Sequence, residues 1–115
     1  LKNAFDWLVG SGNVYRKPLA VISAGTTGGR YARQAMTQTL TWQGAYVVGE
    51  LGITAPRTKS DDQGQFTDVP TITAISSLTG LLLDGAAMPA TALVDVAGRV
   101  LGSLGIDTAH LAPAV

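Results

Sequence analysis

A short segment rich in glycine and hydroxyl side chains carries most of the chemistry that this sequence can offer. It runs from Ser23 to Arg30 as Ser-Ala-Gly-Thr-Thr-Gly-Gly-Arg. Glycines let backbone N–H groups approach a planar or anionic ligand closely, because there is no Cβ in the way. A helix that begins at Gly28 and Gly29 would point its unpaired N–H groups and partial positive charge towards the same ligand. The segment is therefore a candidate ligand-binding loop.

The spacing of the glycines separates this loop from two common phosphate-binding motifs. The pattern is Gly-x-x-Gly-Gly rather than the GxGxxG dinucleotide fingerprint, and the lysine of a Walker A loop is missing. A nucleotide-binding α/β domain of another kind is for that reason the weaker hypothesis. On the loop alone, a tight strand-to-helix turn without any ligand is an equal alternative.

The elements on either side of the loop predict an α/β fold. Residues 19–23 form a short apolar run typical of a strand buried on both faces, and residues 29–43 have the spacing of a helix that ends at Gly44. Residues 45–48 predict a second strand. Strand, helix and strand make a βαβ unit of a parallel sheet, where ligands lie outside the carboxyl ends of the strands. Two strands are too few for such a sheet, so we expect these residues not to fold alone as a monomer.

The second half of the chain predicts two more helices after a polar loop at residues 54–68. One begins at Pro70, capped by Thr67 or Asp68, and the other covers residues 90–104. The apolar positions of the first are Ile72, Ile75, Leu78 and Leu82. The tail after Gly105 predicts no element.

Composition excludes several classes of function. Eight basic and eight acidic side chains cancel among 115 residues, so the chain has no strong electrostatic footprint for nucleic acid or an anionic membrane. It has no cysteine and a single histidine, His110, which excludes thiolate chemistry and a cysteine or histidine metal cluster. The longest apolar run, around residues 81–87, is interrupted by Asp84, so we expect no membrane-spanning segment. These features indicate a soluble, cytoplasmic protein.

The first residues carry a more specific pattern. Leu1, Phe5 and Leu8 fall at helical spacing, so the sequence is expected to start inside a helix of a truncated or processed chain. The segment Leu-Lys-Asn-Ala-Phe-Asp-Trp-Leu at residues 1–8 resembles the LKNAxDWL signature of the NADPH-dependent FMN reductase family. Lys17-Pro18 before a strand, the Ser23–Gly29 loop, and Asp62-Gln63-Gly64 with Thr67-Asp68 are similar to later motifs of that family, in the same order.

The resemblance implies a flavodoxin-like parallel-sheet fold, of which this chain holds only the C-terminal βαβ portion with flanking helices. Residues 1–83 would be the C-terminal part of the reductase domain, and residues 84–115 a helical extension and tail. The family's phosphate-binding loop and PxYN-like segment belong to the N-terminal half and do not occur in this sequence. The residues implied to border FMN are those of the loop together with one lysine of the first helix, namely Ser23, Ala24, Gly25, Thr26, Thr27, Gly28, Gly29 and Lys2.

The implied activity is that of an oxidoreductase that transfers hydride from NAD(P)H, by way of FMN, to a quinone, free flavin or similar small-molecule acceptor. The implied partners are a second copy in a homodimer, a homotetramer, or the N-terminal half of the same fold. A catalytically incomplete fragment or a flavin-free assembly module is the alternative.

Several other side chains have two interpretations. Arg30 and Arg33 could attract the phosphates of NAD(P)H, although we favour ordinary surface positions for both. Tyr15, Trp42 and Tyr46 are predicted to serve in packing.

Overall fold

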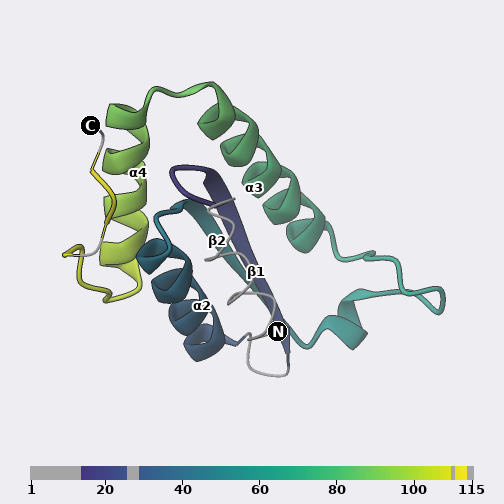
Figure 1. The fold of residues 1–115 in the computed structure, drawn as a ribbon. Coiled ribbons are helices and arrows are strands. Elements are labelled where there is room, and N and C mark those ends of the chain that lie inside the picture. Colours follow the sequence, from purple (N-terminus) through teal and green to yellow (C-terminus); the bar gives the residue numbers. More distant parts are fainter. Residues whose placement is uncertain (1–13, 26–28, 110, 114–115) are drawn as a thin grey trace.

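The computed structural model describes residues 14–25, 29–109 and 111–113. Two parallel strands lie between helices (Figure 1). Strand β1 is Pro18–Gly25, helix α2 is Arg30–Trp42 and strand β2 is Tyr46–Thr54. A 3-10 helix, η1, covers Pro56–Lys59, and helices α3 and α4 cover Val69–Ala87 and Ala90–Ser103. The expected α/β class, with a βαβ portion and flanking helices, is confirmed.

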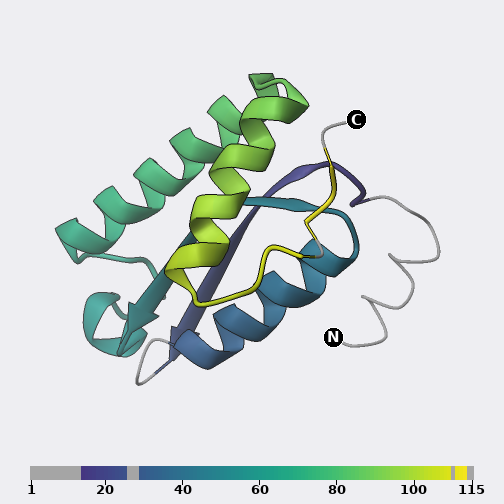
Figure 2. The same ribbon diagram turned by 90° about the vertical axis from the view of Figure 1, so that its left-hand side faces the viewer.

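Strand β2 forms the centre of the core because its residues are buried on both faces of the sheet. Tyr46 and Val48 pack with Leu93 and Ala97 of α4, whereas Val47 between them packs with Val21 of β1 and a leucine of α2. Successive side chains of a strand point to opposite faces, so this alternation places α2 on one face and α4 on the other. Helix α3 contacts both strands. Figure 2 shows α3 and α2 on opposite sides of the strands.

The pairing of the two strands has one irregularity. Leu19 lies opposite Val47, but Ala20 lies opposite Gly49, so β2 holds one extra residue at this point. Such a bulge changes which residues of a strand share a face. Beyond it, Val21 lies opposite Glu50 and Ser23 opposite Gly52, which fixes the side chains at the carboxyl end of the sheet.

Helix α3 begins where the sequence predicted it. The carboxylate of Asp68 caps the helix by accepting from the backbone N–H of Thr71 at 3.1 Å, and Pro70 occupies the first turn. The helix ends at Ala87, so the division predicted after Leu83 falls within it. That division stays a prediction.

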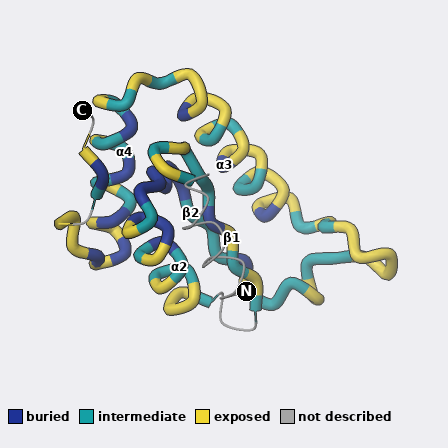
Figure 3. Tube along the Cα trace, viewed as in Figure 1, coloured by how far each residue is buried: buried dark blue, intermediate teal, exposed yellow. Residues whose placement is uncertain are grey.

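The outer side of α3 is largely exposed, as the yellow segments along this helix show in Figure 3. By length and composition alone it is the one helix among the described residues that could cross a membrane. The apolar segment is therefore longer than the sequence indicated, because one Asp84 does not interrupt the 19-residue helix, while the expectation of no membrane-spanning segment stays a prediction. Thr71, Leu78 and Gly85 of this helix are nevertheless buried against the rest of the fold.

The tail after α4 is ordered against the core, although the sequence predicted nothing for it. Leu104 and Ile106 pack with Leu101, and Ala112 joins the cluster around Tyr46. The hydroxyl of Tyr46 donates to a backbone carbonyl of the tail, with the oxygens of Ala112 and Pro113 both at 3.0 Å. The tail is thereby held beside the beginning of β2.

Candidate functional site

The segment predicted as a glycine-rich loop starts within β1, because the strand extends two residues beyond its predicted end at Ser23. Strand β1 ends at Gly25, and Gly29 is the residue that precedes α2. Gly29 has a φ of 69°, in the left-handed region that glycine adopts without steric cost. The carbonyl of Gly25 accepts from the N–H of Ala55 at 3.0 Å, so the ends of the two strands are tied together. Ligands of open α/β sheets bind at this edge.

A hollow of about 420 Å³ opens at this edge between the two strand ends. It is lined by Gly25 and by Ala55, Pro56 and Arg57 of the following turn. Ala55 has a φ of 45°, which is costly for a residue with a Cβ and brings the turn back towards Gly25. A Cβ added at Gly25 would meet none of the described residues within 4 Å, so these residues leave the space in front of it open. The hollow has the size of a small-molecule site, and Arg57 gives it a positive charge.

Behind the loop, three side chains from three elements form a polar network. Arg33 of α2 makes an ion pair with Glu50 of β2 through Nε, and its Nη1 donates to the hydroxyl of Ser23 at 3.0 Å. The Ser23 hydroxyl lies 3.3 Å from the carbonyl oxygen of Gly29 and donates to it. The favoured surface position was wrong for Arg33, because this side chain is only 11% exposed and turned towards the sheet. Arg30 is exposed, as expected.

Sequence reasoning missed Glu50 altogether. An acidic residue in an otherwise apolar strand was the available signal, since a carboxylate on a buried strand needs a partner. Which cation supplies that partner depends on the packing of α2, and no spacing along the chain indicates it.

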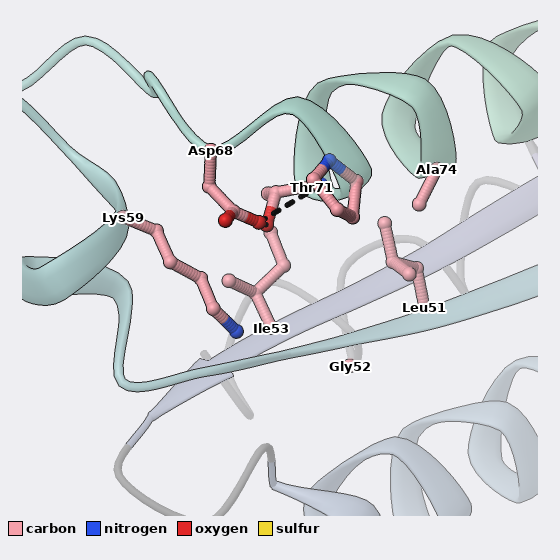
Figure 4. Close-up of a pocket in the computed structure, with 8 residues that line it drawn as sticks. Leu51, Gly52, Ile53, Lys59, Asp68, Thr71 and Ala74 are labelled. Carbon is pink, nitrogen blue, oxygen red and sulfur yellow. Dashed lines mark hydrogen bonds between the residues drawn. The ribbon is translucent and has the colours of Figure 1, made fainter.

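A second, smaller pocket of about 190 Å³ lies on the α3 side of β2 (Figure 4). Asp68, Thr71 and Lys59 contribute its polar side chains. The hydroxyl of Thr71 donates to the Asp68 carboxylate at 2.6 Å and lowers the pKa of that carboxyl, helped by the Thr71 backbone N–H and the charge of Lys59, against a smaller effect of burial. These groups satisfy the start of α3, and the pocket is below the usual size for a cofactor.

The structure brings together four of the predicted site residues. Ser23, Ala24, Gly25 and Gly29 lie at the two ends of the loop, with the Ser23 hydroxyl engaged by Arg33 and Gly29. Thr26, Thr27, Gly28 and Lys2 lie outside the described residues, as does the whole segment that carries the LKNAxDWL pattern. Their roles stay predictions.

The three aromatic residues expected to pack differ in burial. Tyr46 is fully buried, whereas Trp42, the last residue of α2, is 58% exposed. Tyr15 is 52% exposed although its ring lies against Gly44. The prediction of packing is confirmed for Tyr46, while Trp42 and Tyr15 stay about half exposed.

The open hollow fits the edge of a planar ring better than it fits a metal ion. No group of three histidine, cysteine or acidic side chains comes together anywhere in the part of the chain that the structure describes. Gly25 instead leaves the backbone free of side-chain bulk at the strand end, whereas the space beside Gly29 is filled by Ser23. The residues present thus suit the flavin ring, while the phosphate motif of an FMN site is absent from the sequence.

Comparison with known proteins agrees with this geometry. Residues 1–59 match the family described as NADPH-dependent FMN reductase, and this segment contains the LKNAxDWL pattern, both strands, the loop and α2. No curated protein and no solved structure matches the chain. The family match covers more than half of the 115 residues and supports a flavin-dependent NADPH reductase kind of function. The chain belongs to the NADPH-dependent FMN reductase family.

Proposed function

We propose that this protein is a flavin-dependent oxidoreductase that takes reducing equivalents from NAD(P)H and delivers them to a quinone, free flavin or similar small acceptor. The observation that carries the proposal is the open space before Gly25, at the carboxyl ends of both strands, in a chain of the FMN reductase family. FMN supplies the hydride chemistry when bound, and the protein positions and polarises it.

The residues of this chain would bind the cofactor through backbone N–H groups and through the charge of one arginine. Ala24 and Gly25 at the strand end and Gly29 before α2 would border the ring, where N–H groups at the start of the helix favour negative charge. Arg57 lines the same hollow and is exposed, so it would attract an anionic group of the cofactor or of NAD(P)H. The Ser23 hydroxyl is held by Arg33 and by the carbonyl of Gly29, so its role in this proposal is structural.

The test fills the hollow without disturbing the protein around it. Gly25→Val adds a side chain that suits a strand and whose Cβ meets no atom of the described residues beyond its chain neighbours within 4 Å. We expect the full-length wild-type protein to bind FMN, with its yellow absorption, and to oxidise NADPH when a quinone is supplied. Gly25→Val should keep its melting temperature and lose at least tenfold in FMN affinity, a change of about 1.4 kcal/mol.

The control is Gly102→Ala in α4, which also meets nothing within 4 Å and lies outside the loop. It should bind FMN like the wild type. Unchanged FMN affinity in Gly25→Val would refute this placement of the cofactor. A wild-type protein that binds no FMN and oxidises no NADPH would refute the function and favour a flavin-free assembly module.

The partner that we propose completes the sheet. Among the described residues β1 pairs only with β2, so its other edge makes no strand pairing there. An unpaired strand edge is a template for another strand. The N-terminal half of the same fold would supply that strand, while a second copy in a homodimer or homotetramer is the alternative. The mass of the native particle and of the intact chain distinguishes these partners.

A further inference from the structure

We infer that Arg33 and Glu50 are positioning residues of the flavin site: the ion pair orients the Ser23 hydroxyl so that it fastens the end of β1 to Gly29, at the start of α2. This inference rests on the proposed function, because it concerns the shape of the loop that would border FMN. It concerns two side chains for which the family resemblance implied no role in flavin binding.

The register of the sheet places the three side chains on one face. Ser23 lies opposite Gly52, and Glu50 lies two residues earlier in β2, opposite Val21. Val21 packs against the α2 side, and residues two apart along a strand share a face. Arg33 stands in the first turn of α2 and reaches down to that face. The network therefore joins β1, β2 and α2 directly behind the strand end.

The direction of each hydrogen bond follows from the chemistry of the groups. A guanidinium only donates, so Arg33 Nη1 occupies a lone pair of the Ser23 oxygen. The single hydroxyl proton is then directed to the carbonyl of Gly29, 3.3 Å away. That carbonyl also accepts the backbone N–H of Arg33 at 2.9 Å. Arg33 thus contacts both ends of the Ser23–Gly29 link, by its side chain and by its backbone.

Burial makes this arrangement dependent on both charges. The side chains of Arg33 and Glu50 are 11% and 24% exposed. Removing either charge leaves the other partly buried without its partner, which costs more than the loss of an exposed pair. Glu50 fixes the guanidinium through Nε, which leaves Nη1 for Ser23.

Close packing at Gly29 shows how little the loop ends can move. A Cβ built on Gly29 would lie 3.0 Å from the Ser23 oxygen and 3.1 Å from the Ser23 Cβ. The two residues therefore touch although six positions separate them in the sequence. If the Ser23 hydroxyl loses its orientation, both ends of the loop are released together.

The variant Arg33→Lys keeps the positive charge of this side chain but removes the planar shape of the guanidinium. A lysine can keep the pair with Glu50, but a single ammonium lacks the planar fork that serves Glu50 and Ser23 at once. Arg30→Lys is the matched control, because Arg30 is exposed and belongs to the same helical turn. Ser23→Ala removes the hydroxyl and keeps the ion pair. Far-UV circular dichroism of each variant shows whether it is folded.

We expect Arg33→Lys and Ser23→Ala each to weaken FMN binding about tenfold, because the loop ends must then be ordered when FMN binds. The visible circular dichroism of bound FMN should change in both and stay unchanged in Arg30→Lys. The double variant that combines Arg33→Lys with Ser23→Ala should bind FMN no more weakly than either single variant, because the two side chains act as one unit. Amide exchange in the first turn of α2 should be faster in both single variants, with or without FMN.

Equal FMN affinity and an equal flavin spectrum in Arg33→Lys and Arg30→Lys would overturn the inference and leave the proposed function intact. Strictly additive losses in the double variant would also overturn it. A wild-type protein without FMN affinity overturns the proposed function instead. In that case faster amide exchange in Arg33→Lys than in Arg30→Lys supports the link between Ser23 and Gly29, and equal exchange overturns it.

Discussion

Gly29 is the one described residue of the loop with a left-handed backbone, and Gly29→Ala tests how strongly that conformation is required. The residue has a φ of 69° and precedes the first turn of α2. An alanine there must either keep a left-handed conformation or change the path by which the loop enters the helix. Its methyl group would also press against Ser23, at 3.0 Å from the oxygen.

The cost follows from three contributions. A left-handed conformation costs a residue with a Cβ about 1–2 kcal/mol. Displacing the Ser23 hydroxyl from Gly29 weakens a hydrogen bond worth about 1 kcal/mol. Alanine also restricts the unfolded chain more than glycine does, which stabilises the folded state by about 0.5 kcal/mol. The free energy of unfolding should therefore fall by about 2 kcal/mol, which moves a urea midpoint by about 1 M if the denaturant slope is about 2 kcal/mol/M.

The control is Gly80→Ala, the same substitution at a site where it should raise the free energy of unfolding. Gly80 lies inside α3, and a Cβ there meets nothing within 4 Å. Gly80→Ala should raise the free energy of unfolding by about 0.5–1 kcal/mol, through helix propensity alone. Urea unfolding of the wild type and both variants, followed by far-UV circular dichroism, measures the two shifts. A Gly29→Ala variant as stable as Gly80→Ala would refute the constraint that we assign to the loop.

Two further predictions concern the tail and the start of α3. Tyr46→Phe removes the hydroxyl that donates to the buried carbonyl of Ala112, so the free energy of unfolding should fall by about 1 kcal/mol, whereas Tyr31→Phe at an 83% exposed site should leave the urea midpoint unchanged. Faster amide exchange in the tail of Tyr46→Phe should accompany this loss, and unchanged exchange would contradict it. Asp68→Asn keeps a good helix cap but removes a carboxyl group whose pKa the Thr71 hydroxyl lowers. The folded protein favours the charged carboxylate, so the wild type should be more stable than the variant at neutral pH. Because a lowered pKa stabilises above the unfolded value, this advantage should vanish as the pH falls through the lowered pKa, and a pH-independent difference in thermal midpoint would disprove it.

Much of the fold followed from local patterns. The apolar run before the glycine loop predicted β1, and the helical spacing that ends at Gly44 predicted α2, because a strand and a helix each impose a period on their buried side. The cap at Asp68 was predicted from residue type and the proline that follows. Strand β2 proved longer than predicted and runs to Thr54, since Gly49 and Glu50 interrupt the apolar pattern without ending the pairing.

In the candidate site, too, some features could be predicted from the sequence and others depended on packing. The loop and its place at the carboxyl end of β1 were predictable, because glycine content and element order are properties of the chain itself. The pairing of Arg33 with Glu50 was not, because it joins residues 17 positions apart through the packing of α2 on the sheet. The role of Arg57 in the hollow was missed for a similar reason, since the left-handed turn at Ala55 brings it back towards Gly25.

By itself the sequence determined the α/β class, the family and the position of the loop, because periodicity, glycine placement and motif order are carried by neighbouring residues. Only the tertiary structure decided how the ends of that loop are held and which residues line the hollow in front of it. Those features depend on side chains that meet across β1, β2 and α2. Contact between distant residues is set by packing and strand register, and a bulge at a single position of β2 determines which of them face one another.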